Sequence, residues 1–327
     1  MWGKIYSGVS SPDYGIWGGD SSYIVSISWG KFQISMKDLL TRIKNRLLQY
    51  NNDTLSDIIT YKRGILPPIP AYPAIAILPE EEVIRYMFTG GLYRSDKSVS
   101  IEIYVKSASR EYARNKSSEL LDAVRDIIQS DIYLNRYVKD TAISDEVYGI
   151  DVTMGSTFIY ASSMKLKCST RESFPSSRTI EYNVSNSTIS NFVDTVVNIF
   201  KAKSALSSIQ MWIKWSTGNI GRFPAIEFNV GSISRDRSFL GAEDVTIPLE
   251  INLYCKAGAK EQLLNQALDY SETIKEVIHE NPTWNGICYK SSISSITYDI
   301  YSDINHFLYG VKFLVLCKFK DVVDQSN

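Results

Sequence analysis

Few residues in this chain have the type and spacing that catalysis or metal binding requires. The 327-residue sequence contains two histidines, His279 and His306, which are 27 positions apart. Neither belongs to a ligand spacing such as HExxH, so a Ser–His or Cys–His catalytic pair is hard to assemble. His279 is expected at the end of a helix, where a cation interacts favourably with the helix dipole.

The four cysteines are scattered and form no CxxC motif. Cys168 and Cys317 fall in apolar strand patterns, so we interpret them as buried free thiols rather than as ligands. A reducing compartment is the simpler interpretation of this cysteine usage. The sequence also lacks phosphate-binding and nucleophile-elbow motifs. We therefore predict that the protein is not an enzyme and has no catalytic, cofactor-binding or metal-binding residues.

Two charged segments are candidates for contacts between subunits. Glu80, Glu81 and Glu82 open a long predicted loop that also carries Arg85 and Arg94. The corresponding loop further along the chain carries Arg235, Asp236 and Arg237. One loop is led by acidic residues and the other by basic ones, which predicts complementary contacts between the two halves or between chains. Solvated loops are the alternative.

Residues 1–34 form an N-terminal arm rich in glycine and aromatic residues. The segment has too much glycine for a stable helix and too many aromatic side chains for a solvated tail. We expect it to dock on its own domain or on a neighbouring subunit, and an additional strand of the first domain is the alternative. Its candidate interface residues are Trp2, Tyr6, Tyr14 and Trp17.

The rest of the chain repeats one pattern of residues about 150 positions later. Ser35 and the apolar stripe from Leu39 to Leu47 correspond to Thr188 and the stripe from Phe192 to Phe200. Three further blocks recur in the same order, and the offset between copies drifts only from 153 to 149. Short insertions in surface loops explain such a drift, and a fixed internal period indicates a repeat. The further pairs are Tyr72–Ile75 with Phe223–Ile226, Ile101–Lys106 with Ile251–Lys256, and Phe158–Ala161 with Phe307–Gly310.

The repeat predicts an α+β fold of two tandem homologous modules. Each module is expected to contain a mostly antiparallel sheet with two helices packed on one face. The predicted organisation is the arm at 1–34, module A at 35–170, a serine-rich linker at 171–187, and module B at 188–327.

Local patterns predict the elements of each module. Module A is expected to contain helices at 36–50 and 116–130, strands at 71–78 and 98–107 around a loop at 79–97, and two closing strands. Module B is expected to contain helices at 189–203 and 260–280, a hairpin of strands 208–216 and 222–230, a loop at 231–243, a strand at 244–256, and two closing strands.

Composition excludes several functional classes. Hydrophobic residues make up 44% of the chain and charged residues 22%, as in an ordinary globular protein. The formal net charge of −1 gives no indication of nucleic-acid binding. The N-terminal sequence does not resemble a signal peptide, and no apolar run is long enough to span a membrane. We therefore expect no membrane partner.

The order of elements resembles that of the tail terminator and tail completion (neck) proteins of tailed bacteriophages. The likeness covers both modules, although members of that family usually have a single module and lack the aromatic arm. It is carried by helix Met36–Tyr50, the segment Tyr72-Pro73-Ala74-Ile75, strand Val99–Val105 and helix Ser117–Gln129, with their counterparts in module B.

The resemblance implies a structural virion protein at the head–tail junction. Such a protein assembles in the host cytoplasm into a homo-oligomeric ring, caps the tail tube and joins it to the head connector. DNA passes through the ring without sequence-specific contact. Two other functions stay open: a ligand-binding protein or enzyme with a cleft between the halves, and a sheath-initiator or baseplate component of a contractile machine.

Overall fold

The structure is a computed structural model that divides into two units, Met1–Gly30 and Lys31–Asn327. The first unit, with Trp2, Tyr6, Tyr14 and Trp17, lies outside the described residues, so the predicted docking of the arm stays a prediction. The described residues are 34–49, 55–64, 69, 71–86, 92–134, 138–154, 157–173, 189–215, 220–237, 242–257, 260–303 and 306–322.

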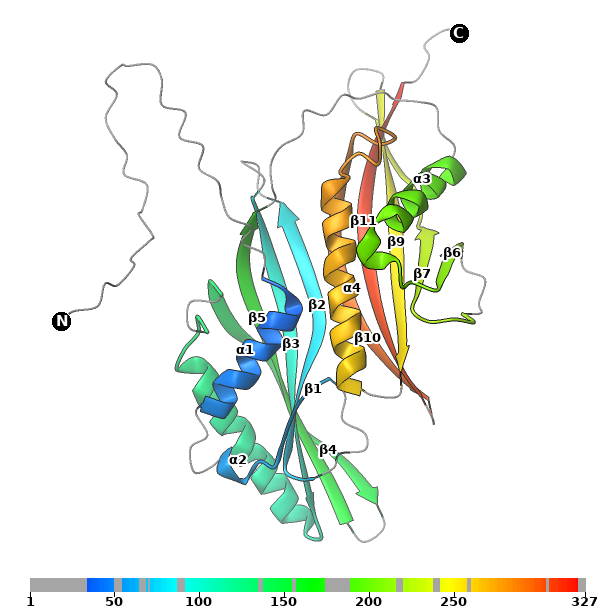
Figure 1. The fold of residues 1–327 in the computed structure, drawn as a ribbon. Helices are drawn as coiled ribbons and strands as arrows, with labels where there is room; N and C mark the ends of the chain where they lie inside the picture. The colour runs from blue at the N-terminus through cyan, green and yellow to red at the C-terminus, as the bar shows by residue number, and fades with distance from the viewer. Residues whose placement is uncertain are drawn as a thin grey trace, which may run out of the picture. The chain divides into compact units, whose positions relative to one another are not determined.

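The second unit is α+β, and one order of elements occurs in it twice (Figure 1). The first half contains α1 (Met36–Gln49), η1 (Leu55–Asp57), β1 (Thr60–Arg63), β2 (Ala74–Tyr86), β3 (Leu92–Ser107), α2 (Arg110–Gln129), β4 (Asp140–Met154) and β5 (Thr157–Ser173). The second half contains α3 (Ile189–Ala202), η2 (Ser204–Leu206), β6 (Met211–Lys214), β7 (Ala225–Val230), β8 (Ser234–Arg237), β9 (Ala242–Ala257), α4 (Lys260–Glu280), β10 (Lys290–Asp303) and β11 (His306–Val322).

All eleven strands belong to one sheet. The strand order is β4-β5-β3-β2-β10-β11-β9-β7-β6, with β1 also on β2 and β8 also on β9. The pairs β1–β2 and β6–β7 are parallel, and every other pair is antiparallel. The predicted α+β class is therefore confirmed, but the strands form one large mixed sheet where a separate sheet was expected in each module. The two halves share the sheet because β2 pairs with β10.

Local sequence signals account for the helices. The Ser35 hydroxyl accepts a hydrogen bond from the Asp38 backbone N–H at 3.0 Å, which is an N-cap for α1. The structure confirms α1, α3 and α4 to within one residue of the predicted ranges. Helix α2 starts six residues earlier than predicted, because Ser109 caps it and Ala113 extends its buried stripe.

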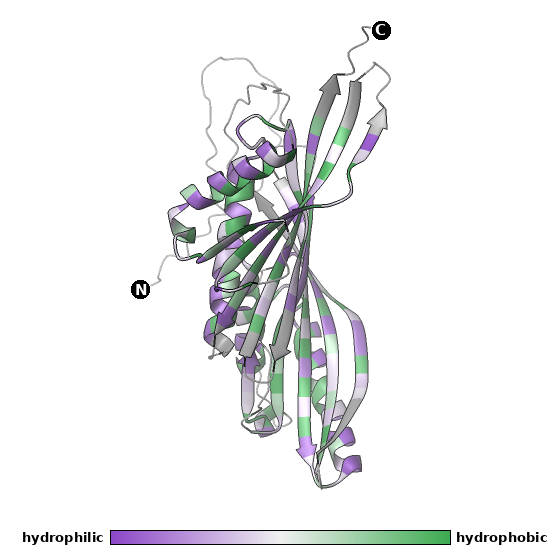
Figure 2. Ribbon diagram, turned by 90° about the vertical axis from the view of Figure 1, so that its right-hand side faces the viewer, coloured by the Kyte–Doolittle hydropathy of each residue, from purple (hydrophilic) through white to green (hydrophobic). Residues whose placement is uncertain are grey.

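Helices and strands enclose a large apolar core, and Ala74, Ala76 and Leu78 of β2 form a second, smaller cluster. Helix α1 packs on β1 and β2, α2 on β3 and β5, and α4 on β9, β10 and β11, while α3 contacts α4 (Figure 1). Alternate residues of β3, including Val99, Ile101 and Ile103, are fully buried in the core that all four helices share. Figure 2 shows the matching alternation of hydropathy along the strands, as expected for strands that bury one face.

Four of the predicted connections are wrong. The loop at 79–97 is largely strand, because β2 continues to Tyr86 and pairs with the first residues of β3. The predicted loop at 231–243 contains β8. Strands β6 and β7 are parallel and do not form the predicted hairpin. Residues 215–224 connect them, whereas a tight hairpin has only two to five connecting residues. The short strand β1 was not predicted.

Candidate functional site

The acidic segment predicted as a subunit contact instead joins the two halves of one chain. Glu81 pairs with Thr297 and Glu82 pairs with Ile296 across the β2–β10 contact. We call this contact, formed by residues 81–83 and 295–297, the junction. Glu80 lies beside it and forms an ion pair with Lys165 of β5 at 2.5 Å.

A buried cluster of charges holds the junction together. The Glu82 Oε1 atom lies 2.7 Å from the ammonium nitrogen of Lys275 in α4 and 3.0 Å from that of Lys97 in β3. The same oxygen accepts a hydrogen bond from the Ser95 hydroxyl at 2.6 Å. Glu82 and Lys97 are fully buried, and the Lys275 side chain is 1% exposed. The cluster therefore places charges from both halves in the core.

The pKa of Glu82 shows how strongly the lysines stabilise its charged form. Burial alone would raise the pKa of this carboxyl group, because a charge loses hydration there. The charges of Lys275 and Lys97, with hydrogen bonds from Lys275 and Ser95, outweigh burial and lower the pKa to about 2. Glu82 is therefore ionised at neutral pH.

Contacts between α1 and α4 extend the junction on the helical side of the sheet. The Lys37 ammonium group lies 2.7 Å from Asp269 Oδ1, and the Met36 backbone N–H donates to Glu272 Oε1 at 3.4 Å. Met36 itself is fully buried. Strand pairing, helix contacts and the charge cluster thus all link the first half to the second.

His279 is part of the same region, and its predicted role is wrong. It lies in the last turn of α4 as predicted, with its Nε2 atom 3.4 Å from the Tyr86 hydroxyl and its ring beside Tyr93. Burial, and then the charge of Lys275, lower its pKa well below the usual histidine value. His279 is therefore neutral and does not serve as a cation at the helix end.

The other predicted charged residues lie apart from the junction cluster. Arg94 donates to Asp96 Oδ1 at 2.8 Å, and Arg85 approaches Asp96 Oδ2 at 3.9 Å. In β8, Arg235, Asp236 and Arg237 pair with residues of β9. Strands β10, β11 and β9 separate β8 from β2, so the acidic and basic segments do not meet within one chain.

Two residues of the cluster, Lys97 and Lys275, were not predicted as site residues. A signal for Lys97 is present in the sequence, because it continues the alternation of Val99, Ile101 and Ile103 toward the start of β3. A lysine on the buried face of a strand requires a buried partner. Lys275 gives a weaker signal in the sequence, because Glu272 and Glu276 of the same helix flank it and suggest a solvated helix face.

The cluster lacks the access that chemistry needs. A lysine activates a serine nucleophile only as a neutral amine that accepts the hydroxyl proton, whereas the Lys97 ammonium group donates to the Ser95 hydroxyl at 2.8 Å. Here the Ser95 hydroxyl donates its own proton to Glu82, and both residues are fully buried. The arrangement fixes the halves of the chain in one register and offers no path to a substrate.

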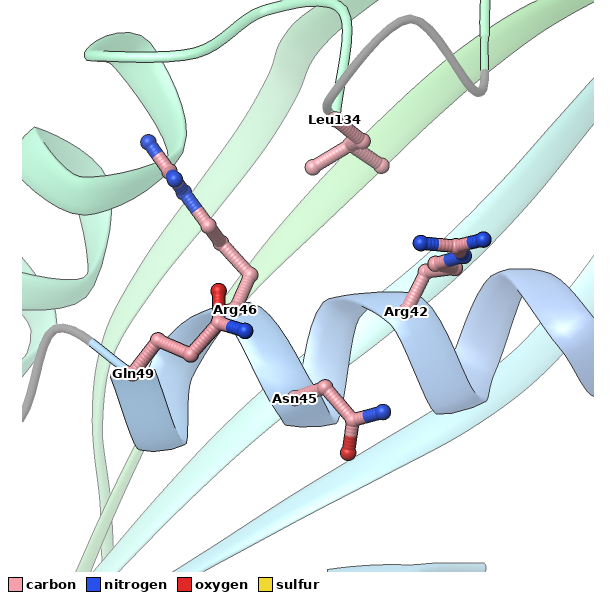
Figure 3. A pocket seen from close by; sticks show the side chains of 5 residues that line it. All are labelled: Arg42, Asn45, Arg46, Gln49 and Leu134. Carbon is pink, nitrogen blue, oxygen red and sulfur yellow. The ribbon is translucent and has the colours of Figure 1, made fainter. Parts of the chain in front are cut away.

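A small pocket lies elsewhere, between α1 and the segment after α2 (Figure 3). Its volume is about 70 Å³, whereas pockets for small ligands typically span roughly 300–1,000 Å³. Arg46 approaches Asp131 at 3.8 Å and donates to the Ser130 hydroxyl at 3.3 Å. This contact ties α1 to the end of α2. The lining residues are Arg42, Asn45, Arg46, Gln49 and Leu134.

The thiols are also removed from solvent. Cys168 and Cys317 are buried, as predicted, and so are Cys255 and Cys288. Burial raises the pKa of Cys168 to about 11 and that of Cys255 to about 12. Within the described ranges, no three His, Cys, Asp or Glu side chains group as metal ligands would, and no helix is long and apolar enough to cross a membrane.

Strand β4 presents the other prominent charged group, at the opposite end of the sheet from β6. Arg125 of α2 donates two hydrogen bonds to Glu146, at 2.7 and 2.6 Å, and a third to the Tyr148 hydroxyl. The bond from Arg125 is the main reason why the pKa of Glu146 is lowered. Val147 and Tyr148 are each 46% exposed.

In comparisons with known proteins, no family model matches the chain, and no curated protein matches it significantly.

Proposed function

We propose that the second unit consists of two tandem homologous modules that arose by duplication. The order α–η–β–β–β–α–β–β occurs in both halves, with β8 additional in the second. The order of strands across the sheet is also the same, since β4-β5-β3-β2-β1 corresponds to β10-β11-β9-β7-β6. A cis peptide bond precedes Pro73 before β2 and Pro224 before β7.

We propose further that the protein is a structural subunit of a homo-oligomeric ring at the head–tail junction of a tailed bacteriophage. The observation that carries this proposal is the junction. There β2 of the first half pairs with β10 of the second half, so two different edges of equivalent halves meet in a heterologous contact. Repetition of such a heterologous contact between chains generates a closed ring when the rotation closes. The resemblance to tail terminator and completion proteins supplies the virion role, in which the ring caps the tail tube and meets the head connector.

A cleft between the halves is less well supported. A ligand-binding protein or enzyme of that kind needs polar groups from both halves in an accessible pocket. Glu82, Lys97 and Lys275 do converge from both halves, but at most 1% of each side chain is exposed. These groups bind one another, and they leave no room for a ligand.

Electron microscopy of purified protein and of virions tests the proposed function. Purified protein at micromolar concentration is expected to form rings, and antibody-conjugated gold is expected to label the virion neck. Label at the baseplate would support the role in a contractile machine instead. Absence of the protein from virions, or a monomer that shows no ring in either sample, would refute the proposal.

A further inference from the structure

We propose that neighbouring copies of the chain pair edge to edge, with β4 of one copy against residues 231–237 of the next, in the register of the junction. We call the side of β4 that faces away from β5 the β4 edge, and the side of residues 231–237 that faces away from β9 the β8 edge. The occupant of each edge is thus a second copy of this chain. The inference rests on the proposed ring, and it specifies the surfaces that would close that ring.

The β4 edge is equivalent to the edge of β10 that the junction covers. Both strands pair on their other side with the last strand of their half, and both carry a bulge at the same point, Ile143/Asp145 in β4 and Ile293/Ser295 in β10. Tyr148 and Tyr298 occupy matching positions four residues beyond the bulge. Tyr298 is 6% exposed, but Tyr148 is 46% exposed.

The β8 edge is equivalent to the part of β2 that forms the junction. Val99 of β3 and Leu249 of β9 are equivalent, 150 residues apart. Val83 pairs with Asp96, three residues before Val99, and Ser234 pairs with Thr246, three residues before Leu249. Ser234 therefore matches Val83. Strand β1 occupies only residues 74–77 of β2, and β6 likewise occupies only residues 225–228 of β7. Among the described residues, β10 covers this stretch in the first half, and no strand pairs with the equivalent stretch in the second half.

In the second half, exposed apolar side chains occupy positions equivalent to residues that are buried at or beside the junction. Ile189, the first residue of α3, is 38% exposed, whereas Met36, the first residue of α1, is fully buried. Ile233 is 40% exposed, whereas the matching Glu82 is fully buried. Both differences are expected if a further copy of the chain covers this edge in the assembly.

Trp215 adds an aromatic side chain to the same edge. Its backbone N–H bonds to Phe228 O after β6, just as the Gly64 N–H bonds to Ile77 O after β1. Both residues have positive φ, 91° for Gly64 and 64° for Trp215. Gly64 lies against Tyr309 and Leu264 of the other half, whereas Trp215 is 43% exposed. Aromatic residues with this exposure are typical anchors of protein interfaces.

The charges on the two edges are compatible with this pairing. At the junction, Lys275 takes its counter-charge from Glu82 on the opposing strand. Arg125 occupies the position of Lys275, but its partner Glu146 is on β4 itself. Residues 231–237 of the neighbouring copy therefore need not supply a carboxylate for Arg125. They carry Ile233 at the position where β2 carries Glu82. Buried Ile247 likewise replaces Lys97, so pairing leaves no buried charge without a partner.

The junction sets the register of the proposed contact. Its pairs are Ser295 with Val83, Ile296 with Glu82, and Thr297 with Glu81. The matching pairs between chains are Asp145 with Ser234, Glu146 with Ile233, and Val147 with Ser232.

Engineered disulfides test this register. The double variant D145C/S234C is expected to yield a ladder of covalent multimers under mild oxidation, in roughly tenfold excess over the out-of-register pair A142C/S234C, because Cα atoms more than about 7 Å apart cannot be bridged. The variant V83C/S295C, placed at an observed junction pair, is the positive control and should form a disulfide within one chain. The four native cysteines are buried and should contribute little.

A second variant tests the contact without a cross-link. Val147→Lys is expected to abolish association and to leave the unfolding midpoint of the monomer unchanged, because the Val147 side chain is exposed. Tyr112→Lys, at another exposed position of the first half, is the matched control and should still associate.

The outcomes separate this inference from the proposed function. Rings that form without the D145C/S234C ladder, while V83C/S295C cross-links, would overturn the inference and leave the ring in place. A ladder of open chains with no closed ring would support the edge contact and overturn the ring. A protein that stays monomeric, with no ladder, would overturn the inference, and labelling of virions would then decide the function.

Discussion

The covered edge of β10 and the open edge of β4 show two ways of placing a cation at an equivalent position. At the covered edge, Lys275 is buried and pairs with Glu82 from the other half. At the open edge, Arg125 pairs with Glu146 of its own half. An obligatory contact within one chain can depend on a shared charge cluster. At the β4 edge the cation has its counter-charge within the same half, so this ion pair does not depend on a strand from the other half.

The largest expected effect comes from removing the charge at the centre of the covered edge. Glu82→Gln removes the charge that buried Lys97 and Lys275 share and leaves Lys275 with the more distant Glu272, at 3.9 Å. The free energy of unfolding should fall by about 3–5 kcal/mol. Denaturant-induced unfolding measures this change. Glu80→Gln is the matched control, because it removes an adjacent but partly exposed ion pair and should cost at most about 1 kcal/mol. Equal losses of stability in the two variants would show that the buried cluster contributes no more than the partly exposed ion pair.

A triple variant separates loss of charge from loss of packing. E82I/K97I/K275M gives the covered edge apolar residues, as Ile233 and Ile247 do at the β8 edge. Replacing a complete buried ion cluster by apolar residues is often neutral or stabilising, so the triple variant should regain most of the stability that Glu82→Gln loses. A triple variant as unstable as Glu82→Gln would mean that the ion pairs themselves stabilise the junction.

Acidic conditions should also weaken the covered edge selectively. The pKa of Glu82 is lowered from 4.5 to about 2, so its contribution is present above about pH 4.5 and is lost as pH falls toward 2. At about 1.4 kcal/mol for each pKa unit, the expected loss is about 3 kcal/mol. Unfolding measured from pH 6 to pH 2 should show a smaller loss in E82I/K97I/K275M than in the native chain. Parallel pH profiles would contradict this prediction.

The residues of this cluster also show how far the sequence could lead. Helices α1, α3 and α4 could be predicted within a residue because capping and the i, i+3, i+4 stripe are local signals. The junction could not be predicted, since it pairs Glu82 with Ile296, more than 200 residues away. The β-bulge between Pro79 and Glu81 decides which of the three consecutive glutamates faces the core. No local pattern reports a bulge, so the sequence alone predicts a loop here, as a contact between halves or subunits or as a solvated segment.

Neutral His279 should give the free energy of unfolding a second pH dependence, smaller than that of Glu82 and at higher pH. Because its pKa is lowered in the folded chain, the histidine contributes stability above its unfolded pKa of about 6.5 and loses it as pH falls. Lys275, Glu82, Tyr86 and Tyr93 are the groups that face it. Stability should therefore decline between pH 7 and pH 5, and His279→Gln should flatten that decline. An unchanged slope in the variant would mean that His279 is protonated in the folded chain.

The smallest effect is expected at the open edge, where Arg125→Met removes the equivalent of Lys275. The Arg125 and Glu146 side chains are about one quarter exposed, and water solvates Glu146 once its partner is gone. The free energy of unfolding should therefore fall by no more than about 1 kcal/mol, as measured by denaturant-induced unfolding of the monomer. Lys275→Met, at the covered edge, should cost several times more, because Glu82 stays buried there. Equal losses of stability in Arg125→Met and Lys275→Met would mean that Glu146 is shielded from water as fully as Glu82 is. The β4 edge would then already be covered within a single chain.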